Sequence, residues 1–369
     1  METGTTSKPT EKQYPCSQCG ANLEFAPGAN SLKCPYCGCE NVIAKSGTSI
    51  QELDYRAYLQ QAANEKDTHE AHRVKCEKCG AETTMPPNVT SGLCPFCGAN
   101  MVFEAKSSHL IRPEGLLPFK VTQKQAFEDF RRWIDSLWFA PNDLKQYARS
   151  EGKLVGIYIP CWTYDSDTTS LYTGERGVHY YTTETYTTTE NGQQVTRTRQ
   201  VQHTAWTPVS GEVSNSFDDV LVVASRSLPK EYADRLQPWD LPNLVPYADE
   251  YLSGFRAESY QVNLEQGFEE ARQIMEPEIT ATVRQAIGGN EQRVDSINTQ
   301  YDKITFKHIL LPVWLSAYRF RDNVYRILIN ARTGETQGER PYSPWKIAAA
   351  VLAALILIAI ILFIANQNQ

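Results

Sequence analysis

Eight cysteines in the first hundred residues have the type and spacing of metal ligands. Four of them read C-x2-C-x14-C-x2-C, and the other four repeat this spacing sixty residues later. The two sets are Cys16, Cys19, Cys34 and Cys37, and Cys76, Cys79, Cys94 and Cys97. Four thiolates give zinc a closed tetrahedral shell with no position left for water or substrate. The spacing therefore predicts two structural zinc ions and argues against catalysis at either of them.

The elements that hold these cysteines must be small ribbons with tight turns. A glycine follows the second cysteine of every C-x-x-C pair, where a side chain would clash with the turning backbone. These glycines are Gly20, Gly38, Gly80 and Gly98. We expect a first ribbon over 1–44, a helical spacer over 45–72 and a second ribbon over 73–106. Each ribbon has too few residues for a sufficient core, so metal binding must supply most of its folding energy. Cys39 is interpreted as a spare thiol.

The charge balance of the chain bears on what the ribbons bind. Lys and Arg number 36 against 43 Asp and Glu, which gives a formal net charge of −7. Neither ribbon has a basic face or stacked aromatic residues that would hold bases. A protein-contact or structural role is therefore favoured, and nucleic-acid binding remains the alternative. The clustering of cysteines near the start indicates metal binding in a reducing compartment rather than a secreted disulfide scaffold.

The last part of the chain has the composition of a membrane span. Residues 347–365 are uncharged and apolar, and as a helix they would extend about 28 Å, close to the hydrocarbon thickness. The rival interpretation is a buried core helix. Trp345, Lys346 and Arg340 precede the apolar stretch, and the absence of an early apolar run argues against a signal peptide. We expect a tail anchor at 346–365, single-pass in the cytoplasmic (inner) membrane, with the N-terminal domains in the cytoplasm.

The region 107–342 is expected to form an α+β body rich in antiparallel strands. A helix is expected after Thr122, which forms a capping box with Gln125, and another after Asn263. Between them lies a hairpin rich in Thr and Tyr, with its turn at Asn191-Gly192. The separate segments FDDVLVVAS and HILLPVWLSAYRF are expected to be further strands.

The body also shows a second internal similarity. Residues 121–134 and 262–275 align without gaps and share five identical positions. Each is followed by an aliphatic-Pro-x-Trp sequence, at 159–162 and 311–314. We interpret the body as two related halves, about 115–225 and 256–340. Chance similarity between two helix starts is the alternative.

No set of side chains in the body has the pattern of a catalytic site. Asp165, Asp167 and Glu175 could form an acidic cluster, but no histidine or nucleophile motif accompanies them. The three histidines of the body are interpreted as core or surface residues: His179, His203 and His308. Cys161 is interpreted as an inert packed thiol. The expectation is that the protein is not an enzyme.

Several segments resemble a known family of bacterial proteins. They are the two CPxCG ribbons, SLWFAPNDLK, GIYIPCWTYD, FDDVLVVAS, TFKHILLPVW and RTGETQGERPYS. Together they resemble zinc-ribbon membrane proteins often named as similar to primosomal protein N′ (replication factor Y), a helicase. The sequence has no G-x-x-x-x-G-K-[ST] loop, so helicase activity is not implied. Some relatives work in envelope stress, and this resemblance implies phage-shock-type or SPFH-like partners at the membrane.

The leading hypothesis is a tail-anchored membrane scaffold or adaptor whose zinc ribbons and α+β body bind protein partners. The protein could also form a homo-oligomer. It would act by raising the local concentration of its partners at the cytoplasmic face. The alternative is a membrane-tethered, replication-associated protein that binds nucleic acid without helicase activity. A third hypothesis, an enzyme centred on the body, would need convergent polar groups in a pocket.

Overall fold

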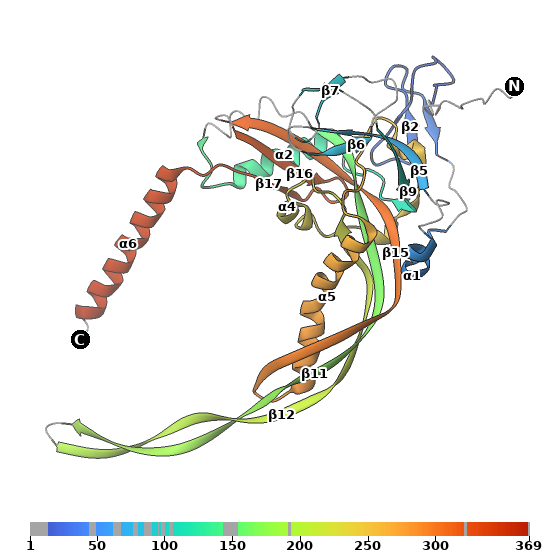
Figure 1. The fold of residues 1–369 in the computed structure, drawn as a ribbon. Helices are drawn as coiled ribbons and strands as arrows, with labels where there is room; N and C mark the ends of the chain where they lie inside the picture. Colours follow the sequence, from blue (N-terminus) through green and yellow to red (C-terminus); the bar gives the residue numbers. More distant parts are fainter. Residues whose placement is uncertain are drawn as a thin grey trace.

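The computed structural model describes most of the chain, and Figure 1 shows its fold. The described residues are 14–43, 49–61, 68–76, 80–84, 91–94, 96, 100–102, 106–142, 154–190, 193–320 and 323–367. They form a mixed helix and sheet structure with antiparallel strands and one apolar helix near the C-terminus. The expected mixture of helices and antiparallel sheet is therefore confirmed.

A nine-stranded sheet forms the body, and three very long strands dominate it. Its main path runs β12 (Gln193–Val223), β11 (Val155–Glu190), β15 (Glu291–Phe320), β10 (Gly115–Leu116) and β13 (Val245–Pro246). Four further strands join its edges: β4 (Leu53–Asp54), β14 (Arg256–Ala257), β16 (Asn323–Asn330) and β17 (Thr336–Gly338). Strand β11 is antiparallel to both β12 and β15, so it is the centre of the long part of the sheet.

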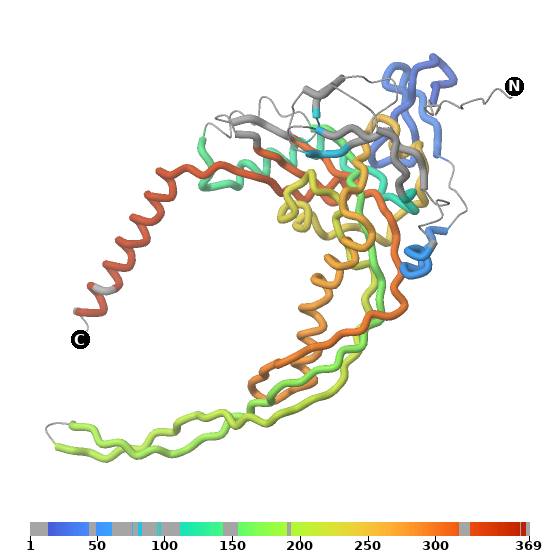
Figure 2. Tube along the Cα trace, viewed as in Figure 1, coloured from blue at the N-terminus to red at the C-terminus, as the bar shows by residue number. Residues whose placement is uncertain are grey.

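The far ends of β11 and β12 form an arm that projects from the body (Figure 2). Strand β15 accompanies β11 as far as Gly177, and beyond that point only β11 and β12 pair. Thr, Tyr and Val recur along the arm because β-branched and aromatic side chains suit a pleated surface. The FDDVLVVAS segment was expected to be a separate strand, but its residues 217–223 are the end of β12. Asn191 and Gly192 lie outside the described residues.

Two helices with matching starts pack on the sheet. Helix α2 (Gln123–Ser136) has the expected capping box of Thr122 and Gln125. Helix α5 (Leu264–Ile287) has the same arrangement with Asn263 and Gln266, and it lies on the concave side of the curved sheet (Figure 1). Both predicted helix starts are confirmed. The shorter helices are α1 (Tyr55–Gln61), α4 (Lys230–Asp234), and the 3-10 turns η2 (Leu241–Asn243) and η3 (Asp249–Leu252).

The central strands are buried on both faces, and their side chains alternate between two parts of the core. In β11, Ile157, Ile159 and Cys161 contribute to one cluster, whereas Tyr158 and Trp162 lie in clusters on the opposite face. Strand β15 follows the same alternation of odd and even positions. Such double burial explains why both strands are continuous apolar runs at this point.

The N-terminal ribbons add small sheets of their own. In the first ribbon, β1 (Glu24–Phe25), β2 (Ser31–Lys33) and β3 (Glu40–Val42) form an antiparallel sheet. The second contains a sheet of β5 (Thr68–Lys75), β6 (Glu82–Thr84) and β9 (Lys106–Ile111), and a pair of β7 (Ser91–Leu93) and β8 (Asn100–Val102).

The expected helical spacer at 45–72 is only partly helical. Helix α1 occupies Tyr55–Gln61, but β4 before it pairs with β15 of the body, and residues 68–72 belong to strand β5. Tyr55, Tyr58 and Leu59 pack against the core beside α5. The helical expectation therefore holds only for α1, and contacts with the body rather than helix propensity determine the structure around it.

Two parts of the body make the same set of contacts. The indole Nε1 of Trp162 donates to the Val262 carbonyl at 2.9 Å, and that of Trp314 donates to the Val121 carbonyl at 2.8 Å. Each indole also contacts the aromatic ring two residues before that valine, Tyr260 or Phe119, with ring centroids 5.1 Å apart in both cases.

The backbone around the two aliphatic-Pro-x-Trp sequences repeats as well. Ala224 N–H donates to the Pro160 carbonyl at 2.9 Å, and Ala331 N–H donates to the Pro312 carbonyl at 3.0 Å. The carbonyls of these alanines accept from the same two valine N–H groups, at 3.2 Å for Val262 and 2.8 Å for Val121. Two helix starts are thus joined to two strands by equivalent bonds.

Helix α6 (Pro344–Gln367) projects from the body near the end of α2 (Figure 1). Within Pro344–Asn366, the most apolar 18-residue window has a mean hydropathy of 3.3, and none of that window is buried. The helix is long and apolar enough to cross a membrane. The alternative, a buried core helix, differs from this arrangement, in which the apolar window is not buried against the chain.

Candidate metal centre

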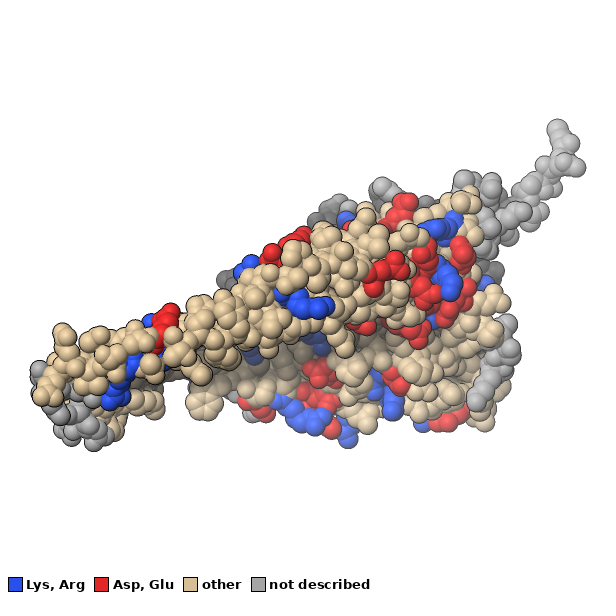
Figure 3. Space-filling model, turned by 90° about the horizontal axis from the view of Figure 1, so that it is seen from below, with Lys and Arg blue, Asp and Glu red and all other residues tan. Residues whose placement is uncertain are grey.

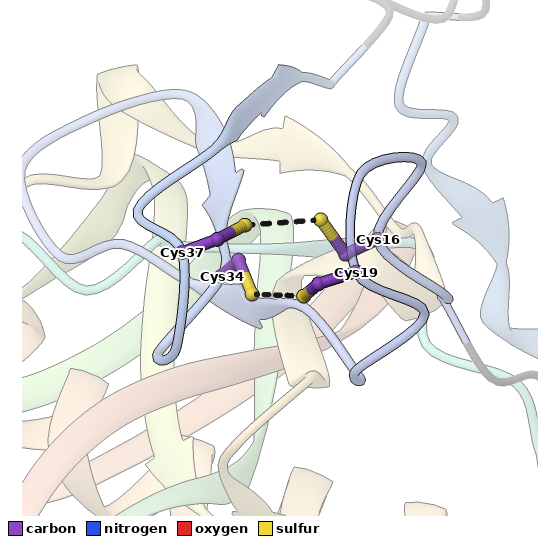
Figure 4. A group of neighbouring side chains, drawn as sticks. All are labelled: Cys16, Cys19, Cys34 and Cys37. Carbon is purple, nitrogen blue, oxygen red and sulfur yellow. Dashed lines mark hydrogen bonds between the residues drawn. The ribbon is translucent and has the colours of Figure 1, made fainter.

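The first four cysteines meet in space, as their spacing predicts (Figure 4). Their sulfur atoms all lie within 4.8 Å of one another, with Cys16 Sγ to Cys37 Sγ and Cys19 Sγ to Cys34 Sγ both at 3.5 Å. Sulfur atoms on a tetrahedral zinc with Zn–S bonds of about 2.3 Å lie about 3.8 Å apart. The four thiols therefore could hold a metal ion such as zinc.

Two matching backbone turns present the sulfur atoms. Gly20 N–H donates to the Cys16 carbonyl at 2.9 Å, and Gly38 N–H donates to the Cys34 carbonyl at 3.0 Å. Both glycines have φ of +75°, in the left-handed region that side-chain-bearing residues avoid. The glycine after each C-x-x-C pair is thus required by the turn.

The surroundings of the first thiol of each pair favour its ionised form. The backbone N–H of Gln18, at 3.4 Å from Cys16 Sγ, and that of Cys19 lower the pKa of Cys16 to about 6. The backbone N–H of Cys37 lowers the pKa of Cys34. Since zinc binds thiolates, these donors suit Cys16 and Cys34 to a cation, whereas the pKa values of Cys19 and Cys37 are raised through hydrogen bonds with the neighbouring cysteines.

The second set of cysteines is described only in part. Cys76 and Cys94 are buried, and Cys79 and Cys97 lie outside the described residues. The turn after Cys76 matches the first ribbon: Gly80 has φ of +75° and its N–H donates to the Cys76 carbonyl at 2.7 Å. The second four-cysteine site remains a prediction, supported by this equivalent turn.

The first ribbon is fixed to the body. Phe25 N–H donates to the Ser253 carbonyl at 3.0 Å, and the Ser253 hydroxyl donates to the Leu23 carbonyl at 2.6 Å. Gly28 N–H donates to the Phe119 carbonyl at 3.0 Å. Cys16 and Cys34 are buried within the same core cluster as residues of α2, so one side of the metal centre belongs to the body core. Cys39 lies outside the four-sulfur group.

The acidic residues singled out from the sequence do not form one site. Asp165 lies with Asp218 and Asp219, with carboxylate oxygens within 4.8 Å, whereas Asp167 pairs with Lys303 and Glu175 with Arg293. A register shift between Asp165 and Asp167 separates them. Sequence reasoning missed Asp218 and Asp219 because they come from the neighbouring strand.

A buried lysine neutralises part of this carboxylate group. Lys307 Nζ lies 2.7 Å from Asp219 and 2.9 Å from Glu52, and its side chain is only 8% exposed. The charge of Asp219 raises the pKa of Asp218. An internal ammonium ion already supplies the cation that the cluster needs, so we interpret it as structural.

The remaining candidates occupy unrelated positions. His179 bonds Glu291 at 2.7 Å and His203 bonds Thr182 at 2.8 Å, both on the arm. His308 is buried, and its Nδ1 bonds the Ile111 carbonyl at 2.9 Å. Cys161 is fully buried, and burial raises its pKa, as expected for an inert packed thiol.

One buried acid escaped the sequence analysis. Glu258 follows β14 and is 3% exposed; it accepts hydrogen bonds from the Ser227 hydroxyl and from the Gln261 amide, the latter at 3.3 Å. Burial raises the pKa of Glu258 to about 8. Nothing in the local sequence distinguishes this glutamate from an exposed one, because its burial depends on segments distant in the chain.

The buried glutamate should make stability depend on pH. Its pKa rises from 4.5 to about 8 on folding. Between these values the native state holds more protons than the unfolded state, so stability falls as pH rises, by at most about 1.4 kcal/mol per pH unit. Glu258→Gln cannot ionise and should lack this loss. We expect the variant to gain in thermal midpoint over the wild type from pH 5 to pH 8 in detergent, with exposed Glu276→Gln as the control. Identical pH profiles would contradict the assignment.

The comparisons with known proteins give one similar sequence and no family. The chain is 25% identical over 342 residues to the uncharacterized protein YdjG of Bacillus subtilis (strain 168), a match that covers 91% of this chain and 92% of that protein. No protein-family profile matches, and no solved structure matches. The resemblance to proteins named after primosomal protein N′ therefore gains no support from the comparisons. The similarity thus extends over nearly the full length of both chains.

Proposed function

We propose that this protein is a single-span membrane scaffold that holds protein partners at the cytoplasmic face of the membrane. The observation that carries the proposal is helix α6, whose apolar window is entirely exposed beside a folded body. An exposed helix of that composition is unstable in water and stable across a bilayer. The first ribbon, which contains the metal centre, is docked on that body, so zinc would rigidify a surface that α6 tethers to the membrane.

Charge near α6 supports the proposed orientation. Lys346 and Arg340 precede the apolar stretch, together with Trp345, and residues 366–369 are uncharged. Lys and Arg are enriched on the cytoplasmic side of membrane spans, and Trp is enriched at the interface. The same orientation keeps the cysteine thiols in a reducing compartment.

The outer side of the first ribbon is suited to a protein partner. Tyr36, within the turn between Cys34 and Cys37, and Val42, in strand β3, are each 83% exposed. Large apolar side chains held rigidly at the surface are typical anchors of protein interfaces. The opposite side of the ribbon is docked on the body, so partner binding would occur at Tyr36 and Val42.

The charge distribution supports protein rather than nucleic-acid partners. On the face drawn in Figure 3, Lys and Arg are interspersed with Asp and Glu, and no basic stripe follows the arm. Binding to phosphate backbones needs clustered positive charge. The resemblance to envelope-stress proteins makes phage-shock-type or SPFH-like proteins the partner class to test first.

A crosslinked pull-down tests the proposal. Full-length protein would be captured from detergent-solubilised membranes beside Tyr36→Ser/Val42→Ser, and both protein and nucleic acid would be quantified. We expect specific proteins to fall by about tenfold with the variant, since loss of interface anchors costs more than about 1 kcal/mol each. Leu171→Ser, which alters an apolar side chain 56% exposed on β11, is the matched control. Nuclease-sensitive nucleic acid with no stable protein would instead support the nucleic-acid alternative.

We also infer that 115–225 and 256–340 are copies of one ancestral unit. The repeated indole and backbone hydrogen bonds support this, and so do the strand registers. Leu116 of β10 lies opposite Leu310, and Ala257 of β14 lies opposite Tyr158. Leu116 and Ala257 each lie five positions before the valine of their repeat, Val121 or Val262. Leu310 and Tyr158 each lie two positions before the proline of an aliphatic-Pro-x-Trp sequence. The matching registers favour duplication over chance similarity of two helix starts.

A further inference from the structure

A group of exposed aromatic side chains surrounds the start of helix α6. Trp345 is 83% exposed and Tyr342 is 56% exposed, just before the apolar stretch. Distant in sequence, Trp138 is 77% exposed and Phe139 is 40% exposed, in the turn that follows α2. Four large aromatic residues therefore face solvent at the end of the body from which α6 leaves.

Hydrogen bonds tie the turn after α2 to the start of α6. Ser343 N–H donates to the Phe139 carbonyl at 2.8 Å. Lys346 Nζ donates to the Ala140 carbonyl at 2.8 Å and to Asn142 Oδ1 at 2.7 Å. Two segments about two hundred residues apart are thus held together at the point where the apolar helix begins.

The turn after α2 presents its aromatic residues rigidly. Leu137 is 4% exposed and Ala140 is 1% exposed, so the residues on either side of Trp138 and Phe139 are anchored in the core. Ala140 N–H also donates to the Leu137 carbonyl at 3.3 Å. Burial of the flanking residues forces the two rings outward, where water is a poor solvent for them.

We propose that Trp138 and Phe139 form a second membrane contact, which enters the interfacial region of the same bilayer that α6 crosses. This rests on the proposed anchoring by α6. Lys346 immediately precedes the apolar residues, so its ammonium lies at headgroup depth when the helix spans, and the turn bonded to that ammonium lies at the same depth. Trp and Tyr favour this depth because they join an apolar ring to a polar group.

The consequence is a fixed orientation of the body on the membrane. A single span defines one point of attachment but not which face of the body meets the membrane. A second contact at the end of α2 defines which face of the body meets the lipid headgroups. Surfaces distant from that contact, including Tyr36 in the first ribbon, would then be presented in a constant direction.

The test is fluorescence quenching by brominated lipid. Full-length protein would be reconstituted into vesicles of phosphatidylcholine and phosphatidylglycerol, with and without bromine on the acyl chains near the headgroups. We would compare the wild type with Trp138→Phe and Trp345→Phe. Trp239→Phe, which alters an indole packed against the core beside α4, is the control.

The two proposals fail in different ways in this experiment. We expect each of Trp138→Phe and Trp345→Phe to lower the quenchable fluorescence by about half, because one of two interfacial indoles remains. If only Trp345→Phe lowers it, the second contact is overturned while the anchor stands. If only Trp138→Phe lowers the quenchable fluorescence, the proposal that the turn after α2 and the start of α6 lie at the same depth is overturned. If neither lowers it, the anchor itself is overturned.

Discussion

Removal of residues 346–369 is expected to release the protein from the membrane. The deleted stretch contains twelve Ile, Leu, Val or Phe residues between positions 347 and 365. At about −0.3 to −0.6 kcal/mol each, they favour insertion by about 4–7 kcal/mol. The truncated chain should move from the membrane pellet to the soluble fraction after centrifugation, and it should keep the thermal transition of the body, because none of the helix's apolar window is buried against it.

A shorter deletion provides the control. Removing only residues 366–369 leaves the whole apolar stretch, so that variant should stay in the pellet even after alkaline extraction. The aromatic residues of the turn after α2 remain in both variants, and they are too few to replace the span. A truncated chain that pellets as fully as the wild type after a high-salt wash would show that something other than α6 anchors the protein.

Loss of the first metal centre is expected to unfold the first ribbon and weaken the body. Cys16→Ser/Cys19→Ser removes two of the four ligands, and structural zinc contributes about 10–16 kcal/mol to the folding of small zinc modules. The zinc content of purified protein should fall from two ions per chain to one. Because Leu23, Phe25 and Cys34 belong to the same core cluster as Phe119 and residues of α2, the thermal midpoint of the body should fall as well.

The control for this prediction is Cys39→Ser, which alters a thiol outside the four-sulfur group. It should retain two zinc ions and the wild-type thermal midpoint. Limited proteolysis adds a local readout, since cleavage within residues 14–43 should increase only in the ligand variant. Unchanged zinc content in Cys16→Ser/Cys19→Ser would show that the ligands have been assigned wrongly.

The features that could be predicted from the sequence are those set by local chemistry. The first four cysteines and their glycine turns follow from zinc geometry, and the capping boxes at Thr122 and Asn263 follow from neighbouring side chains. The apolar helix follows from composition alone. In each case the residues that decide the structure lie within a few positions of one another, or repeat at a fixed spacing.

The features that escaped prediction depend on contacts between distant segments. The length of β11 and β12 is determined by their pairing with each other and with β15, so FDDVLVVAS was wrongly separated from the strand to which it belongs. The docking of the first ribbon through Ser253 and the burial of Glu258 likewise need the folded body. The acidic group at Asp165 was assigned the wrong partners because a cross-strand neighbour cannot be inferred from residue spacing.

The measurement that tests the central claim most directly is sided proteolysis of sealed membrane vesicles that contain the full chain, with an epitope tag at each end. In vesicles with the cytoplasmic face outward, we expect protease to remove the N-terminal tag and digest the body while the C-terminal tag is protected. In vesicles of the opposite orientation, only the C-terminal tag should be lost. Loss of both tags from the same face would contradict a single span, and protection of the body with the cytoplasmic face outward would contradict the proposed scaffold.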